Sequence, residues 1–189
     1  MDVAEKVVLD RADVSRAVAR MAHEIVERIA RHPDTELAIV GIQRRGVILA
    51  NRLQAQVAEL LSTPVALGSL DISFHRDDVG RRATAPVVHA TAIDFPLDGA
   101  TVVIVDDVLF TGRTVRAAID ALFEYGRPAR VQLAVLVDRG HRELPIRPDY
   151  IGKNLPTSLA ERVNVRVAEL DGVDQVSIGV APHAEGVTA

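Results

Sequence analysis

The spacing of apolar residues predicts a long amphipathic helix near the start of the chain. Within residues 10–32 the apolar positions recur every three or four residues and therefore share one helical face: Val14, Val18, Met21, Ile25 and Ile29. Asp10 or Asp13 can cap the start of this helix, and Pro33 marks its end.

Farther along, apolar runs alternate with helical patterns. Residues 37–40 form a short apolar run, and residues 101–105 and 131–137 form runs typical of strands buried on both faces. Helical patterns follow at residues 46–61 and 114–125. Because strands and helices alternate, the predicted fold class is α/β, a parallel sheet flanked by helices with right-handed crossovers.

The remaining segments complete a single domain over residues 1–180, because one core can serve a chain of up to about 250 residues. We expect a disordered tail after this domain, at residues 181–189. Within the domain we expect an extended segment at residues 64–74 and a charged loop at residues 75–82. Two short final strands are expected at residues 163–170 and 176–180.

Composition and charge narrow the classes of function. The 189 residues are 48% hydrophobic and carry a net charge of −4, so binding to a nucleic acid would require a local basic patch. The absence of cysteine excludes disulfides and thiolate zinc sites. The N-terminus lacks a signal-peptide pattern, and no apolar run approaches the ~18 residues needed to span a bilayer. The cytoplasm is therefore the expected compartment.

The segment most informative about chemistry is residues 102–114, with the sequence VVIVDDVLFTGRT. Asp106 and Asp107 follow an apolar strand, at the position where open α/β sheets place their ligands. Thr111, Gly112 and Thr114 form a short turn before a helix, and the free N–H groups of a helix start suit a phosphate. This pattern predicts a ligand with a ribose diol and a phosphate, the carboxylates binding the hydroxyls and the loop amides the 5′-phosphate.

A different interpretation of the same acids is a Walker B element that binds only a metal. That element requires a partner loop of the form GxxxxGK[ST]. Residues 41–46 have the glycine spacing, but Val47 stands where the lysine is needed. The 41–46 turn precedes a helix and contains Arg44 and Arg45, so it is itself a candidate anion site.

The full order of strand, Asp-Asp and Thr-Gly-x-Thr resembles the signature for 5-phosphoribosyl-1-pyrophosphate (PRPP) in type I phosphoribosyltransferases. The resemblance implies that fold, with a small hood, and Mg²⁺ bound through PRPP without a direct protein ligand. It also implies that the 41–46 turn holds pyrophosphate and that Arg76, in a loop closing over PRPP, reaches it. The catalytic residues would be Arg45, Arg76, Asp106 and Asp107. The PRPP and nucleotide site would comprise Arg44, Arg45, Gly46, Asp106, Asp107, Val108, Leu109, Phe110, Thr111, Gly112, Arg113 and Thr114.

A longer likeness narrows the family. Residues 133–158, together with the RMAHE motif of residues 20–24, closely resemble the PyrR family of pyrimidine operon attenuation regulators and uracil phosphoribosyltransferases. The resemblance implies binding to a stem-loop of the pyrimidine leader mRNA, promoted by UMP or UTP, and synthesis of UMP and pyrophosphate from uracil and PRPP. It also implies a homodimer or higher homo-oligomer. Uracil would bind at Val137, Asp138 and Arg139. The RNA surface would comprise Arg20, His23, Arg28, Arg142, Arg147 and Lys153.

Several positions depart from the PyrR pattern. Ala19, Leu159 and Ala160 replace residues expected beside the RNA surface. Three departures lie in the loops predicted to bind PRPP and pyrophosphate, and they favour weak catalysis: Arg44, His75 and Phe110. The alternative function is a housekeeping uracil salvage enzyme without an RNA role, and a purine phosphoribosyltransferase is a more distant third.

Overall fold

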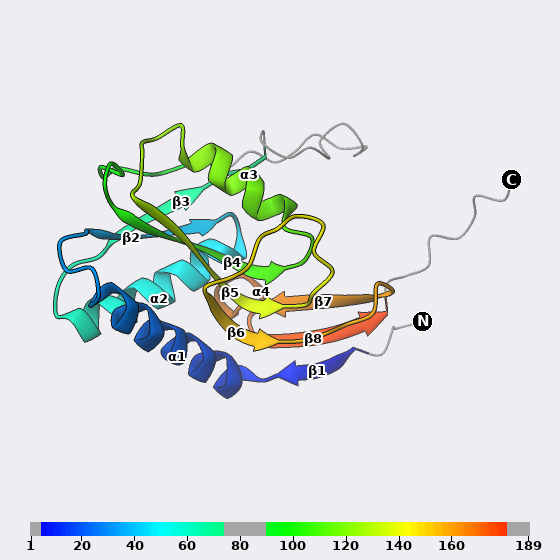
Figure 1. Ribbon diagram of the computed structural model, residues 1–189. Helices are drawn as coiled ribbons and strands as arrows, with labels where there is room; N and C mark the ends of the chain where they lie inside the picture. The colour runs from blue at the N-terminus through cyan, green and yellow to red at the C-terminus, as the bar shows by residue number, and fades with distance from the viewer. Residues whose placement is uncertain (1–4, 74–89, 181–189) are drawn as a thin grey trace, which may run out of the picture.

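The computed structural model describes residues 5–73 and 90–180. Its centre is a parallel sheet in the order β3-β2-β4-β5-β6 (Figure 1). In chain order its strands are β2 (Leu37–Ile42), β3 (Ala66–Leu70), β4 (Thr101–Leu109), β5 (Arg130–Asp138) and β6 (Tyr150–Asn154). The predicted α/β class with a parallel sheet is confirmed.

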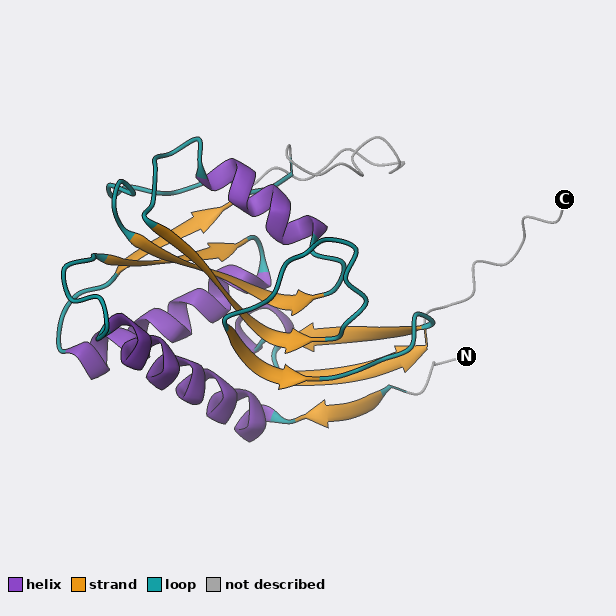
Figure 2. Ribbon diagram, viewed as in Figure 1, coloured by secondary structure: helices purple, strands orange, loops and turns teal. Residues whose placement is uncertain are grey.

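Helices cover both faces of this sheet (Figure 2). Helices α1 (Arg11–Ile29) and α2 (Arg45–Leu61) pack on one face, and α3 (Arg113–Leu122) packs on the other. Strand β4 contributes to both interiors, because Val103 and Val105 face α1 and α2 while Val102 and Ile104 face α3. This two-sided burial explains why β4 is apolar at successive positions.

A smaller antiparallel sheet forms the hood, a term used below for β1, β7, β8 and α4. The order of the strands is β1-β8-β7, with β1 at Lys6–Leu9, β7 at Glu161–Arg166 and β8 at Gln175–Val180. The short helix α4 (Ala168–Asp171) connects β7 to β8. Figure 1 shows the hood beside the carboxyl ends of β4 and β6, so the two sheets face each other across the ends of the parallel strands.

The first helix begins where its sequence indicates. Asp10 is the N-cap, because its side chain accepts a hydrogen bond from the Asp13 N–H while the Asp13 carboxylate accepts from the Asp10 N–H. The helix ends at Ile29, earlier than the predicted end at His32. Arg28 near this end is bonded to Asp149 of the β5–β6 connection, which fixes the helix against the sheet.

Two further predicted boundaries, both of strands near the candidate site, are wrong. The predicted strand at residues 101–105 continues to Leu109, so Asp106 and Asp107 lie within β4 and not after it. The predicted strand at residues 163–170 ends at Arg166, and α4 follows. Strands β1 and β6 were not predicted. The expected loop at residues 75–82 and tail at residues 181–189 lie outside the described residues.

No helix in the described ranges is long and apolar enough to cross a membrane.

Candidate functional site

The connection from β4 to α3 is the turn predicted to bind the 5′-phosphate. Gly112 is the residue before α3 and has a φ of 94°, a left-handed conformation that residues with a side chain rarely adopt. Gly112 provides no side-chain cap at this helix start, an arrangement in which N–H groups of the first turn can donate to a bound anion. The Thr111 hydroxyl lies within 3.4 Å of the Arg113 N–H. This turn corresponds to the predicted 5′-phosphate site.

The two carboxylates are held by the backbone beside them. Asp106 is buried, and its Oδ1 accepts a hydrogen bond from the Asp107 N–H at 2.9 Å. Asp107 Oδ1 accepts from the Val108 N–H at 2.8 Å. Asp107 also lines an open cavity of about 470 Å³ between the parallel sheet and the hood. Of the two acids, Asp107 is therefore the one placed to meet a ligand in that cavity.

Two glycines let the predicted pyrophosphate turn pack tightly against its neighbours. A Cβ on Gly46 would lie 2.5 Å from the Val105 carbonyl oxygen, and a Cβ on Gly41 would lie 2.4 Å from the Val47 Cα. The close approach joins the start of α2 to β4. It also brings Arg45, the first residue of α2, to the same cavity as Asp107.

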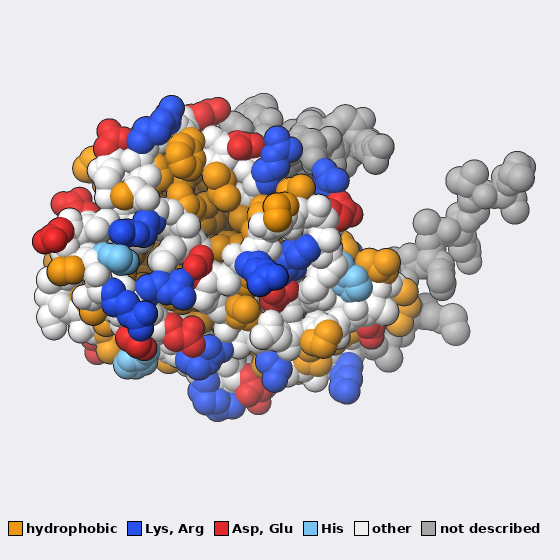
Figure 3. Space-filling view, viewed as in Figure 1, with side chains coloured by type: hydrophobic (Ala, Val, Ile, Leu, Met, Phe, Trp, Pro, Cys, Tyr) orange, Lys and Arg blue, Asp and Glu red, His pale blue; other side chains and the backbone are white. Residues whose placement is uncertain are grey.

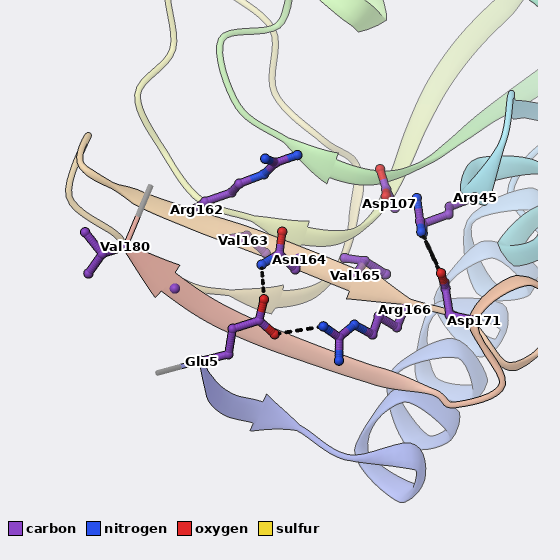
Figure 4. A pocket seen from close by; sticks show the side chains of 11 residues that line it. Glu5, Arg45, Asp107, Arg162, Val163, Asn164, Val165, Arg166, Asp171 and Val180 are labelled. Carbon is purple, nitrogen blue, oxygen red and sulfur yellow. Dashed lines mark hydrogen bonds and ion pairs between the residues drawn. The ribbon is translucent and has the colours of Figure 1, made fainter. Parts of the chain in front are cut away.

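The hood supplies the opposite wall of this cavity. In Figure 4, Arg162 extends from β7 into the space before Asp107, while Arg45 and Asp171 lie against each other at one side of that space. Arg45 donates to both carboxylate oxygens of Asp171, with Nη2 2.9 Å from Oδ1. Glu5, the residue before β1, accepts hydrogen bonds from Asn164 and Arg166 of β7, so Arg166 is already paired. No ion pair of Arg162 is found within the described residues.

Asp171 has a second role in shaping this wall. Its Oδ2 accepts a hydrogen bond from the Val167 N–H at 2.9 Å, which turns the chain from β7 into α4. That bond, followed by the bond from Arg45, lowers the pKa of Asp171 below its ordinary value. Arg52 of α2 forms a parallel link, with ion pairs to Glu169 and Asp174. Helix α2 and the hood are therefore joined at two points.

The sequence analysis did not identify Arg162, Arg166 or Asp171 as part of the site. The alternation in β7 contains a usable signal, because Val163 and Val165 are buried and the polar residues between them must face the other way. The role of Asp171 has no such signal, since it depends on a partner more than a hundred residues away.

The predicted uracil site lies at the end of β5. Val137 is buried, and Asp138 accepts hydrogen bonds from the Gly140 N–H and from Arg142. Arg139 is buried and donates to the Thr157 hydroxyl and to the carbonyl oxygens of Ser158 and Glu161. Burial lowers the pKa of Arg139. Its guanidinium also lies over the Phe110 ring, 4.2 Å from the centroid. The structure thus brings the segment predicted to bind uracil into contact with the predicted PRPP loop, residues 106–114.

Four of the predicted RNA-binding residues lie on α1 and β6. Arg20 donates to the carbonyl oxygens of Ile151 and Gly152 and pairs with Glu24. Arg28 pairs with Asp149 and lies over the Tyr150 ring. In Figure 3, Lys and Arg side chains gather over α1 and β6 on the face in view. The other two of the four, His23 and Lys153, are exposed.

The remaining two predicted RNA-binding residues are in the β5–β6 connection. Arg147 is exposed, whereas the Arg142 side chain is only 22% exposed and is hydrogen-bonded to its own chain. Arg76, predicted to reach pyrophosphate, lies outside the described residues.

Comparison with known proteins agrees with this geometry. The phosphoribosyl transferase domain family matches residues 7–169. The chain is 59% identical over 175 residues to the Bifunctional protein PyrR of Roseiflexus sp. (strain RS-1), covering 92% of this chain and 94% of that one. It is 56% identical over 174 residues to the Bifunctional protein PyrR of Chloroflexus aurantiacus, with coverages of 92% and 94%.

A solved structure shares the fold at low sequence identity. The hypoxanthine phosphoribosyl transferase of Trypanosoma cruzi has a TM-score of 0.72 and 18% identity, covering 96% of this chain and 94% of that one. Both the domain match and the identity to PyrR proteins extend over most of the chain, through the parallel sheet and the phosphate turn. The chain therefore belongs to the PyrR family of phosphoribosyltransferase-domain proteins.

Proposed function

We propose that this protein regulates pyrimidine biosynthesis genes by binding the leader mRNA in a uridine-nucleotide-dependent manner, and that it also converts uracil and PRPP into UMP and pyrophosphate. The observation that carries the proposal is the 59% identity to a Bifunctional protein PyrR over nearly the whole chain. Both activities use molecules of the cytoplasm, which is where we expect the protein to act.

In the catalytic proposal, each part of the candidate site has one task. Asp106 and Asp107 would accept hydrogen bonds from the ribose hydroxyls, and the N–H groups at the start of α3 would bind the 5′-phosphate. As the ribosyl centre gains positive charge, a uracil nitrogen bonds to it while the bond to pyrophosphate breaks and the proton of that nitrogen is released to solvent, so no protein nucleophile is required. Arg45, which lines the same cavity as Asp107, would stabilise the departing charge, together with Arg76.

Magnesium fits this proposal as a partner of PRPP. Within the described residues there is no group of three or more acidic or histidine side chains that could hold a metal alone. Asp107, half-buried at the cavity, would stay with the ribose hydroxyls, and PRPP oxygens would hold the ion without a direct protein ligand. Bound through PRPP, Mg²⁺ would supply positive charge to the pyrophosphate.

For uracil, the proposal uses the end of β5. Arg139 lies over the Phe110 ring, and Val137 and Asp138 pair with Val108 and Leu109 of β4, so a base held there would be near the ribose site. The Arg139 guanidinium is occupied by the carbonyl oxygens of Ser158 and Glu161, which favours recognition of uracil through backbone groups of this segment.

For RNA, the proposal uses Arg20, His23, Arg28, Arg147 and Lys153 as a phosphate-binding surface. A shallow groove of about 480 Å³ runs between α1 and β6 and is lined by Arg20 and Lys153. With aromatic residues at 3% of the chain, contacts to phosphates and to RNA shape would dominate over base stacking. A homodimer would double this modest surface.

One observation favours the alternative of a salvage enzyme without an RNA role. Glu24 and Asp149 pair with Arg20 and Arg28, so two of the cations on this surface are partly neutralised. The two functions are separated by titrating a pyrimidine leader stem-loop with the protein in the presence and absence of UMP. UMP-enhanced binding supports the regulator, and UMP synthesis without leader binding supports the salvage enzyme.

A further inference from the structure

Arg142 differs from the other predicted RNA-binding residues in the number of hydrogen bonds that it makes within the chain. Its guanidinium makes four hydrogen bonds, to the carbonyl oxygens of Ile146, Phe110 and Gly140 and to the Asp138 carboxylate. A guanidinium has five N–H groups, so these bonds leave almost none for an external phosphate. Its side chain is also only 22% exposed.

The partners of Arg142 belong to three different parts of the proposed machinery. Phe110 is in the PRPP loop, and its carbonyl oxygen lies 2.8 Å from Nη1. Asp138 is in the proposed uracil segment. Ile146 immediately precedes the exposed Arg147, and its carbonyl oxygen lies 3.0 Å from Nε. One side chain therefore joins the nucleotide-binding segments to the loop that carries a proposed RNA contact.

Neighbouring contacts make the two loops a single packed unit. The Thr111 carbonyl oxygen accepts hydrogen bonds from the N–H groups of Glu143 and Leu144. Arg113, the first residue of α3, pairs with Glu143 at 2.7 Å. A Cβ on Gly112 would lie 3.4 Å from Leu144 and Ile146 side-chain atoms, so the turn before α3 is in contact with the β5–β6 connection that carries Arg147.

We propose that Arg142 is a positioning residue that couples nucleotide occupancy to RNA binding and does not itself contact RNA. The proposal rests on the regulatory function above. When the amides of the PRPP loop face a phosphate, the Phe110 and Thr111 carbonyls on the other side of the loop face Arg142 and the 143–144 backbone. Nucleotide binding therefore favours the loop arrangement in which Arg142 also fixes Ile146, and with it Arg147. By linkage, the same contacts strengthen nucleotide binding when RNA is bound.

The test compares Arg142→Lys and Arg142→Gln with Arg147→Gln, using Arg116→Gln on the exposed face of α3 as the matched control. Lysine keeps the charge but cannot bridge Asp138 and the Phe110 carbonyl at once, because it lacks the planar fork. Each variant is measured for leader RNA affinity over a range of salt, with and without UMP, and for UMP affinity by calorimetry. Thermal unfolding identifies any variant that does not fold.

Both Arg142 variants should retain the wild-type salt dependence of RNA binding. The factor by which UMP increases RNA affinity, the UMP factor, should fall to about one. Their UMP affinity without RNA should also fall, by at least about fivefold, because the Phe110 carbonyl and the Asp138 carboxylate lose the guanidinium that fixes them. Arg147→Gln should flatten the salt dependence by about one unit of slope yet keep the UMP factor. Arg116→Gln should match the wild type. Arg142→Lys supplies the test if the glutamine variant does not fold.

The proposal is overturned if Arg142→Lys keeps the UMP factor, or if Arg142→Gln loses about one unit of salt slope with UMP affinity unchanged. Either result would make Arg142 an ordinary phosphate contact. A wild-type protein with no preference for leader RNA would instead remove the proposed function and the RNA half of this inference. Calorimetry would still decide the nucleotide half, since unchanged UMP affinity in both Arg142 variants overturns it.

Discussion

Arg45 Nη2 lies 2.9 Å from Oδ1 of Asp171, so the first residue of α2 is bonded to the hood at the edge of the cavity. Arg45 is also the cation proposed to receive the pyrophosphate. A ligand with pyrophosphate must therefore share or replace the Asp171 carboxylate as the partner of Arg45.

The first prediction is that Asp171→Asn strengthens pyrophosphate binding. Asparagine retains an oxygen that can accept from the Val167 N–H, but it removes the charge that competes for Arg45. Because the pair is partly exposed, we expect a gain of roughly two- to fivefold in affinity, measured by calorimetry with inorganic pyrophosphate. Glu169→Gln is the matched control, since it weakens the neighbouring link to Arg52 and leaves Arg45 paired. Equal effects of the two substitutions would show that Asp171 acts only through stability.

Asp107→Asn should abolish detectable PRPP and UMP binding while the protein remains folded. The asparagine oxygen can still accept from the Val108 N–H, so local structure is preserved, but the charged acceptor for the ribose hydroxyls is lost. Asp120→Asn, on the exposed face of α3, is the control and should bind like the wild type. UMP affinity that stays the same in Asp107→Asn would refute the assignment of the ribose site.

A third prediction concerns the contact between the pyrophosphate turn and β4. In Gly46→Ala the new methyl group would lie 2.5 Å from the Val105 carbonyl oxygen, a backbone atom that cannot rotate away. We expect a loss of about 1–3 kcal/mol in the free energy of unfolding, measured by urea denaturation. Gly179→Ala should cost much less, because its nearest neighbour is the flexible side chain of Glu5. Similar losses in both variants would argue against a specific close approach at Gly46.

Stability at high pH should depend on Tyr150. Burial raises the pKa of Tyr150 to about 12, and its hydroxyl donates to Gln132 at 2.9 Å. In the unfolded chain a tyrosine loses its proton near pH 10, roughly two units lower. The folded state therefore loses stability as pH rises above about 10, because the unfolded state releases the proton first.

Tyr150→Phe should remove that loss, as measured by denaturation at about pH 9 and about pH 11. Tyr125→Phe, at an exposed tyrosine, should keep the wild-type pH dependence. The explanation fails if Tyr150→Phe loses stability over this range as steeply as the wild type.

Particular residues explain which parts of the structure could be predicted from the sequence. Residues 102–105, just before Asp106, are all apolar because both faces of β4 are buried. This pattern made the central strand predictable. Strand β6 was missed because Gly152, Lys153 and Asn154 have low strand propensity. Gly152 is required there, since a Cβ would lie 2.5 Å from the Leu136 carbonyl oxygen of β5.

The same reasoning applies to the candidate site. The phosphate turn is local, so Thr111 and Gly112 could be recognised from their order along the chain. The predicted strand at residues 163–170 extends beyond β7, but the chain turns after Arg166 because Asp171 and Asp174 accept hydrogen bonds from the N–H groups of Val167 and Ala168. Such long-range and turn-specific hydrogen bonds leave no periodic signal in the sequence.

The partners of Arg142 illustrate the largest gap between sequence and structure. In the sequence Arg142 is one more cation in a basic segment, and it was grouped with Arg147 on the RNA surface. The bond to Phe110 joins residues 32 positions apart, and only the fold brings them together. Burial and bonding distinguish a cation that organises a loop from one that is free to meet a phosphate.

We propose that one chain binds both a uridine nucleotide and leader RNA, and that the two sites are coupled. The most direct measurement is the affinity of the wild-type protein for a pyrimidine leader stem-loop and for a scrambled hairpin, with and without UMP, at about 0.15 M salt. The account predicts preference for the leader stem-loop, tighter binding with UMP, and an equal tightening of UMP by the RNA. Equal affinity for the two RNAs, unaffected by UMP, would contradict it and leave a uracil salvage enzyme.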